Sequence, residues 1–117
     1  MKIHQQVAIV TGAAKGIGAS ISRALAAAGA RVVCADIDGK AAGNIAKELG
    51  GDCMPLTVDV GDVESIETML DQTMEQFGQL NTIVNNAGVT RSAYIMDLTE
   101  SDSVSYTHLT LPTSDLV

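Results

Sequence analysis

Residues 7–18 read VAIVTGAAKGIG, and this stretch sets the architecture of the chain. Its first five residues form a continuous apolar run, which predicts a strand buried on both faces of a parallel sheet. After the glycines, apolar residues recur at helical spacing and predict a helix ended by Gly29, with one face formed by Ile17, Ile21, Leu25 and Ala28. A strand that turns through glycines into a helix offers unpaired N–H groups and a positive dipole end to a phosphate.

The alternation of strand and helix continues along the chain. Further strands are expected at 31–36, 53–58 and 80–84, and helices at 39–49 and 62–77. Pro55 suggests that the third strand lies at a sheet edge. The last helix is expected to turn one stripe to the core, formed by Val63, Ile66, Leu70, Met74 and Phe77. This order predicts an α/β fold with parallel strands and right-handed crossovers, half of a doubly wound sheet.

Composition narrows the possible partners. The 117 residues suffice for one domain, and no apolar run approaches the roughly 20 residues of a membrane span. The net charge is −7 with no basic patch, so we expect neither nucleic acid nor a membrane as partner. Cys34 and Cys53 lie in apolar runs behind no signal peptide, which favours two buried thiols in a cytoplasmic protein. Without CxxC spacing, and with His4 far from His108, no metal site is expected.

The glycine turn has two readings when taken alone. Gly12 would allow the tight turn, while Gly16 and Gly18 would let the backbone approach a pyrophosphate. The spacing G-x-x-x-G-x-G differs from the dinucleotide fingerprint G-x-G-x-x-G, and helix caps and tight packing also use glycine. The ends of the other strands favour a ligand site, because Asp36, Asp59-Val60 and Asn85-Asn86-Ala87-Gly88 would meet at one edge of a parallel sheet.

TGAAKGIG, Asp36, Asp59-Val60 and NNAG, in this order, resemble the short-chain dehydrogenase/reductase family from about Gln6 to Asp102. The resemblance implies a Rossmann-like sheet with strand order 3-2-1-4, here truncated to its amino-terminal half. It also implies a nicotinamide dinucleotide, with Asp36 at the adenosine ribose and Asp59 and Val60 beside adenine. The residues implied at the diphosphate are Gly12, Lys15, Gly16, Ile17 and Gly18, and those implied to brace the sheet beside the cofactor are Asn86, Ala87 and Gly88.

The resemblance leaves the cofactor and the substrate partly open. A basic residue such as Lys15 can meet the 2′-phosphate of NADP, whereas Asp36 would repel it, so we expect NAD rather than NADP. The segments NNAGVTR and MDLTESD are similar to those of acyl-carrier-protein ketoreductases and sugar-alcohol dehydrogenases. The implied parent is a cytoplasmic homo-oligomer that transfers hydride between nicotinamide and a small carbonyl or alcohol substrate.

The catalytic residues of the family are missing from this chain. The family uses a Ser and a Tyr-x-x-x-Lys, but Tyr94 is followed four positions later by Leu98 and Tyr106 by Thr110. No catalytic residue is therefore predicted, and the chain is expected to be inactive as it stands. Two alternatives stay open: a non-catalytic nucleotide-binding module or sensor, and a fragment of a Rossmann-like methyltransferase or flavoprotein.

The carboxyl-terminal segment has a different character. The predicted cofactor domain spans 1–102, and 103–117 is predicted to be a non-native tail, because VSYTHLTLPT resembles the translation of a transposon-type sequencing adapter. If the native chain is interrupted there, the fourth strand is expected to present an open edge that carries Ile83 and Val84.

Overall fold

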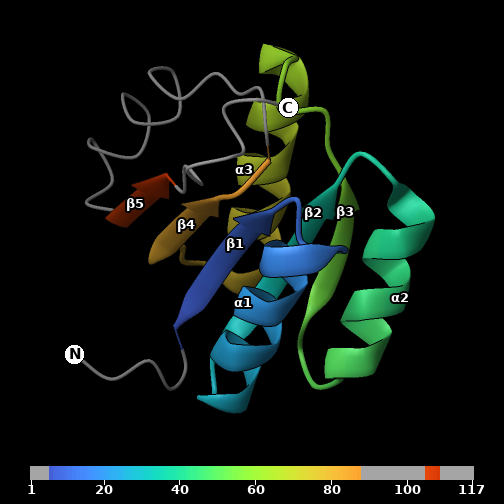
Figure 1. The fold of residues 1–117 in the computed structure, drawn as a ribbon. Helices are drawn as coiled ribbons and strands as arrows, with labels where there is room; N and C mark the ends of the chain where they lie inside the picture. The colour runs from blue at the N-terminus through green and yellow to red at the C-terminus, as the bar shows by residue number, and fades with distance from the viewer. Residues whose placement is uncertain (1–5, 88–104, 109–117) are drawn as a thin grey trace.

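The computed structural model describes residues 6–87 and a short strand at 105–108, and it shows a parallel sheet flanked by helices (Figure 1). The strand order is β3-β2-β1-β4-β5, and every neighbouring pair is parallel. The predicted α/β fold and the order 3-2-1-4 are thereby confirmed. In chain order the elements are β1 (Val7–Thr11), α1 (Gly16–Ala27), β2 (Arg31–Asp36), α2 (Gly39–Leu49), β3 (Met54–Thr57), α3 (Val63–Phe77), β4 (Thr82–Asn85) and β5 (Ser105–His108).

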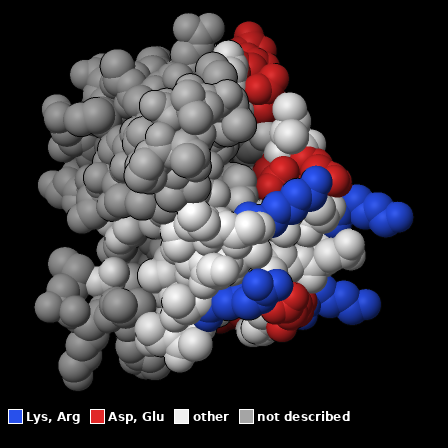
Figure 2. Space-filling model, viewed as in Figure 1, with Lys and Arg blue, Asp and Glu red and all other residues white. Residues whose placement is uncertain are grey.

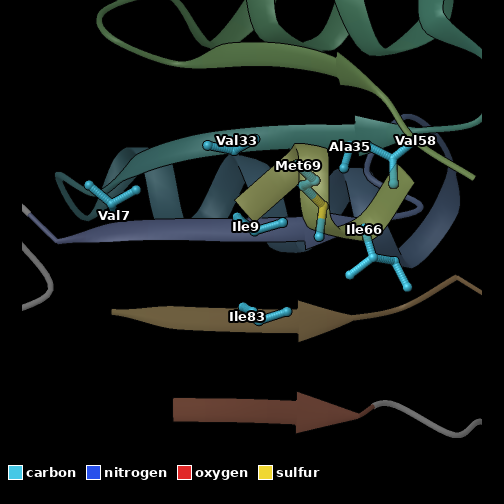
Figure 3. Packing of buried hydrophobic residues seen from close by; sticks show 8 residues of the cluster. All are labelled: Val7, Ile9, Val33, Ala35, Val58, Ile66, Met69 and Ile83. Carbon is cyan, nitrogen blue, oxygen red and sulfur yellow. The ribbon is translucent and has the colours of Figure 1, made fainter. Parts of the chain in front are cut away.

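Successive strand residues point to opposite faces of the sheet, and each face has its own core. One core packs under α3 and takes Val7 and Ile9 from β1, with Ile66 and Met69 from the helix (Figure 3). The other core lies under α1 and α2, and Val10 belongs to it. Both faces of β1 are therefore buried, as its unbroken apolar sequence predicted. The carboxyl ends of the strands stay uncovered by these helices and form the edge where a ligand can bind.

The predicted helix stripes are largely confirmed, since Ile66 is buried in one core and Ile21 and Leu25 pack against the other. Two of their members are wrong, because Ile17 in α1 is 40% exposed and Met74 in α3 is 47% exposed. The residues buried in their place include Ser22 and Thr73, which look polar in sequence. Each hydroxyl donates to the carbonyl oxygen four residues earlier, at 2.9 Å for Ser22 and 2.8 Å for Thr73, so burial leaves neither hydroxyl without a hydrogen bond.

The edge of β4 differs from the expectation. The structure pairs β5 with β4 in parallel, with Ile83 opposite Tyr106, so β4 does not form an open edge. A parallel neighbour requires a crossover of about a dozen residues or more, and residues 86–104 provide that length. At the other side of the sheet, β3 pairs only with β2, which agrees with the edge position that Pro55 suggested.

The surface charges, the helices and the cysteines can be compared with what the sequence led us to expect. On the described part of the face in Figure 2, basic and acidic side chains are interspersed and form no continuous basic patch. No helix in the described ranges is long and apolar enough to cross a bilayer. Both cysteines are free thiols; Cys34 is buried as expected, whereas Cys53 is only half-buried.

Candidate nucleotide-binding site

The turn after β1 is held by the hydroxyl of Thr11. This buried hydroxyl donates to Oδ1 of Asn85 at 2.9 Å and accepts from the backbone N–H groups of Asn86 at 3.0 Å and Ala87 at 3.2 Å. Gly12 follows with φ +64°, a conformation that side chains rarely adopt. The ends of β1 and β4 are therefore fixed to each other at the carboxyl edge of the sheet.

Gly18 packs the start of α1 against this turn. A Cβ atom at Gly18 would lie 1.9 Å from the carbonyl oxygen of Gly12 and 2.6 Å from Nδ2 of Asn86. The same Asn86 amide donates to the Gly12 oxygen at 3.4 Å. Gly18 is buried, and its lack of a side chain allows the close packing of helix and turn; its predicted place at a diphosphate stays a prediction.

The start of α1 differs from the starts of the other described helices. Asp38 and Asp62 cap α2 and α3 by accepting from backbone N–H groups, whereas Lys15 makes no side-chain cap at α1. The first N–H groups of a helix have no partner within the helix. Gly16 is exposed with φ +54°, and no atom lies within 4 Å of the place where its Cβ would stand. This end of α1 is an open, positively polarised surface that suits a phosphate.

Asp36 is held in place at the end of β2. One carboxylate oxygen accepts from the N–H of Ala14 and the other from the N–H of Asp38, both at 3.1 Å. Each carboxylate oxygen has two lone pairs, so both can accept a further hydrogen bond from a ligand hydroxyl. The first contact joins the acid directly to the glycine turn, across 22 positions of sequence.

A pocket of about 230 Å³ opens between the ends of β1, β2, β3 and β4. Ile37 stands at this pocket with 69% of its surface exposed, which leaves an apolar side chain open to a ligand. One carboxylate oxygen of Asp59, Oδ1, already accepts a hydrogen bond from the N–H of Gly61 at 2.9 Å. The residues that line the pocket are Gly12, Ala35, Asp36, Ile37, Val58, Asp59, Val60 and Ala87.

Most of the predicted site residues converge here. The pocket is lined by five of them, Gly12, Asp36, Asp59, Val60 and Ala87. Lys15, Gly16 and Ile17 lie exposed at the adjacent start of α1, while Gly18 and Asn86 support the turn from behind. Gly88 lies outside the described residues. Within residues 6–87, no group of three or more His, Cys, Asp or Glu side chains is placed to hold a metal ion.

The sequence analysis gives no role to Ile37 or Asp38, and it does not predict the hydrogen bond between Thr11 and Asn85. Thr11 and Asn85 are polar residues at the ends of two buried strands, and that position was a signal for a structural hydrogen bond. Ile37 stands directly after Asp36 at the end of β2, and its apolar side chain gave no signal of a place at the pocket.

Parallel strands in this order, a glycine turn into an uncapped helix and an acid at the end of β2 define a Rossmann-like nucleotide-binding domain. The family model described as short chain dehydrogenase matches residues 6–111, and the chain belongs to this family.

Two relatives illustrate the range of the family. The chain is 36% identical over 102 residues to a 3-oxoacyl-[acyl-carrier-protein] reductase of Salmonella typhimurium, covering 87% of this chain and 42% of the relative. It is 38% identical over 104 residues to a D-threitol dehydrogenase of Mycolicibacterium smegmatis, covering 86% of this chain and 40% of the relative. The chain thus spans less than half the length of these curated relatives.

The fold is similar to that of a 3-ketoacyl-(acyl-carrier-protein) reductase from Brucella melitensis, solved in complex with NADH. The TM-score is 0.72 at 30% sequence identity, over 74% of this chain and 36% of the other. The matched part of this chain thus corresponds to about a third of that enzyme.

Proposed function

We propose that this chain forms the NAD-binding half of an oxidoreductase that transfers hydride between a nicotinamide and a carbonyl or alcohol substrate. One observation carries the proposal: four strand ends meet in a single pocket directly beside the uncapped start of α1. The chemistry of these residues fits a dinucleotide in three parts, namely diphosphate, ribose and adenine.

The diphosphate would lie against the start of α1. The space beside Gly16 is open, and the N–H groups of the first turn would donate to phosphate oxygens along the helix dipole. Lys15 is exposed at the same place and would add a positive charge. Any side chain at Gly16 would both strain the backbone, because its φ is positive, and occupy the space for the ligand.

The adenosine would extend along the strand ends. Asp36 would accept hydrogen bonds from the ribose hydroxyls with a carboxylate that two backbone N–H groups already orient. Adenine would lie in the pocket between Ile37 and Val60. At about 230 Å³ the pocket is smaller than the roughly 300–1,000 Å³ of whole-ligand sites, which suits one base rather than a complete dinucleotide.

When bound, the nicotinamide supplies the hydride acceptor or donor, and this chain's residues bind and orient the nucleotide. The printed sequence contains no Tyr-x-x-x-Lys, so we expect binding without turnover. For the whole enzyme we propose a 3-oxoacyl or sugar-alcohol substrate, the two classes named for its relatives. A reducing cytoplasm suits the two free thiols.

The test is NADH binding, followed by fluorescence of the reduced nicotinamide, with Gly16→Ala compared with Gly78→Ala. Both glycines have positive φ and open space at the Cβ position, so both substitutions strain the backbone by about 1–2 kcal/mol. Only Gly16 lies at the proposed diphosphate site; Gly78 ends α3. We expect Gly16→Ala to weaken NADH binding at least tenfold and Gly78→Ala to leave it within twofold. Equal effects, or no NADH binding by the unchanged chain, contradict the proposal.

A second candidate is a nucleotide-binding module without redox activity, because the pocket and the start of α1 would bind a nucleotide without any catalytic residue. The two candidates differ in the encoding gene. A natural coding sequence that continues into a Ser and a Tyr-x-x-x-Lys supports the enzyme, and a natural stop codon after residue 117 supports the module.

A further inference from the structure

The loop that follows β3 forms one side of the pocket in which adenine is proposed to lie. Three consecutive residues of this loop, Val58, Asp59 and Val60, line the pocket. Because β3 lies at the edge of the described sheet, the loop has a neighbouring strand, β2, on one side only. The N–H of Val58 donates to the carbonyl oxygen of Asp36 at 3.0 Å, and after this bond the chain leaves the sheet. Contacts outside the sheet therefore fix the two residues that follow.

Ser65, in the first turn of α3, supplies such a contact. Its half-buried hydroxyl accepts a hydrogen bond from the backbone N–H of Asp59 at 2.9 Å. The next residue of the helix, Ile66, is fully buried in the same core as Val58 (Figure 3). This packing fixes the start of the helix relative to the end of β3, and it brings the Ser65 hydroxyl to the Asp59 backbone.

The turn at Asp59 orients the carboxylate of that residue. Its Oδ1 accepts from the N–H of Gly61 at 2.9 Å, and its carbonyl oxygen accepts from the N–H of Asp62 at 3.0 Å. A Cβ atom at Gly61 would lie 3.3 Å from Oδ1, so the turn is closed tightly around the carboxylate. An ionised carboxylate only accepts hydrogen bonds, and adenine offers its exocyclic amino group as a donor. The acid therefore suits adenine better than hypoxanthine, which carries an oxygen in place of that amino group.

We propose that Ser65 is a positioning residue for recognition of the base, which holds Asp59 and Val60 at the pocket by accepting the hydrogen bond from the Asp59 N–H. Ser65 is not among the residues that line the pocket, so it acts through the loop and not on the nucleotide. The inference rests on the proposed function. Without the hydroxyl the Asp59 N–H loses this partner, and the loop moves to satisfy it elsewhere. The start of α1, proposed to meet the diphosphate, makes no use of this bond.

The test compares ADP-ribose with its hypoxanthine analogue, IDP-ribose, by calorimetry of the 117-residue chain. The readout is the ratio of the affinity for ADP-ribose to that for IDP-ribose, because a general loss of folded protein lowers both affinities equally and leaves this ratio unchanged. We expect Ser65→Ala to lower the ratio about twofold to tenfold, the effect of one hydrogen bond. Ser65→Thr keeps the hydroxyl and should preserve the ratio. Thr68→Ala, at an exposed position one turn later in α3, is the matched control and should also preserve it.

Two further measurements show whether Ser65 acts through Asp59. In a chain that carries Asp59→Ala there is no carboxylate to position, so adding Ser65→Ala should leave the ratio unchanged. Hydrogen exchange of the Asp59 amide should be about twofold to tenfold faster in Ser65→Ala, with exchange at Val58 unaltered.

Four results overturn the inference: a ratio that Ser65→Ala leaves unchanged, a ratio that Ser65→Thr lowers equally, a ratio that still falls without the Asp59 carboxylate, or unaltered exchange at Asp59. Failure of the unchanged chain to bind ADP-ribose instead overturns the proposed function, and this inference with it.

Discussion

Replacing Gly18 by alanine tests the packing on which the whole site depends. The new Cβ would lie 1.9 Å from the Gly12 carbonyl oxygen, whereas Cβ atoms in proteins essentially never come within 3.0 Å of another heavy atom. The helix and the turn must therefore separate by about 1.1 Å, the difference between these distances. The Gly12 oxygen is backbone, so no side-chain rotation can relieve the contact.

The cost can be worked from its parts. Overpacking of a tight contact costs about 1–3 kcal/mol, and loss of the hydrogen bond from Asn86 to the Gly12 oxygen adds about 0.5–1.5 kcal/mol. Alanine regains about 1 kcal/mol of helix propensity. We expect Gly18→Ala to lower the free energy of unfolding by about 0.5 to 3.5 kcal/mol, against the roughly 5–15 kcal/mol typical of a domain.

Urea denaturation followed by far-UV circular dichroism measures this change, and Gly43→Ala is the matched control. Gly43 lies inside α2 with no atom within 4 Å of the Cβ position, so the same substitution should raise the stability by about 0.5–1 kcal/mol. Opposite signs for the two variants support the packing account. If Gly18→Ala is as stable as the unchanged chain, the account of α1 against the glycine turn is refuted.

Three further predictions concern the network, the thiols and the sheet edge. Thr11→Val removes the acceptor of two N–H groups at the end of β4, so the free energy of unfolding measured by urea titration should fall by about 2–4 kcal/mol. Thr11→Ser keeps the hydroxyl and should change it by less than about 1.5 kcal/mol. Equal losses in the two variants would contradict the role of the hydroxyl. Burial, with a smaller contribution from Cys53, raises the pKa of the Cys34 thiol to about 12, so at pH 8 Ellman's reagent should label Cys53 well before Cys34, and equal rates in Cys34→Ser and Cys53→Ser would oppose this. The raised pKa of Cys34 also makes the stability depend on pH. Below the ordinary value of 9.0 the buried thiol stays protonated and the free energy of unfolding is unaffected by it; as pH rises from there toward 12, the free energy of unfolding falls. Deletion of residues 103–117 removes β5 and exposes the backbone of β4, so light scattering should detect more aggregation than after deletion of 109–117 alone; equal aggregation would mean that β5 does not protect the edge.

The alternation of strand and helix could be predicted because β1 and β2 are buried on both faces, whereas the order 3-2-1-4 was implied by the family resemblance. Both strands are unbroken apolar runs; Gly12 follows the first, and the second ends at Asp36. The helix starts at Gly39 and Val63 were also within reach of the sequence, because Asp38 and Asp62 precede them as caps.

The buried polar and glycine residues of the helices could not be predicted from hydrophobicity alone. Ser22 and Thr73 are buried because their hydroxyls bond within their own helices, and Gly18 is buried because α1 approaches the turn so closely. A polar residue that satisfies itself in this way gives no signal in an apolar stripe. The ion pair between Lys15 and Asp38 could not be predicted either, because the two residues begin different helices that only the fold brings together.

The non-native origin of residues 103–117 stays a prediction. We propose that residues from about Val104 onward derive from a sequencing adapter, although the structure includes Ser105–His108 as β5. The encoding DNA decides the matter: the codon series GTC TCT TAT ACA CAT CTG ACG CTG CCG ACG supports an adapter, and any unrelated codons for the same residues exclude it.

The most direct test of the nucleotide site is a titration of the ¹⁵N-labelled chain with NADH, monitored through its backbone amide resonances. The account predicts saturable shifts at the start of α1, at Asp36 and Ile37 and at Val60, with the turn at Gly50 and Gly51 unaffected. Shifts confined to the groove lined by Met54, Leu56 and Gln72, or no saturable shifts at all, would contradict it.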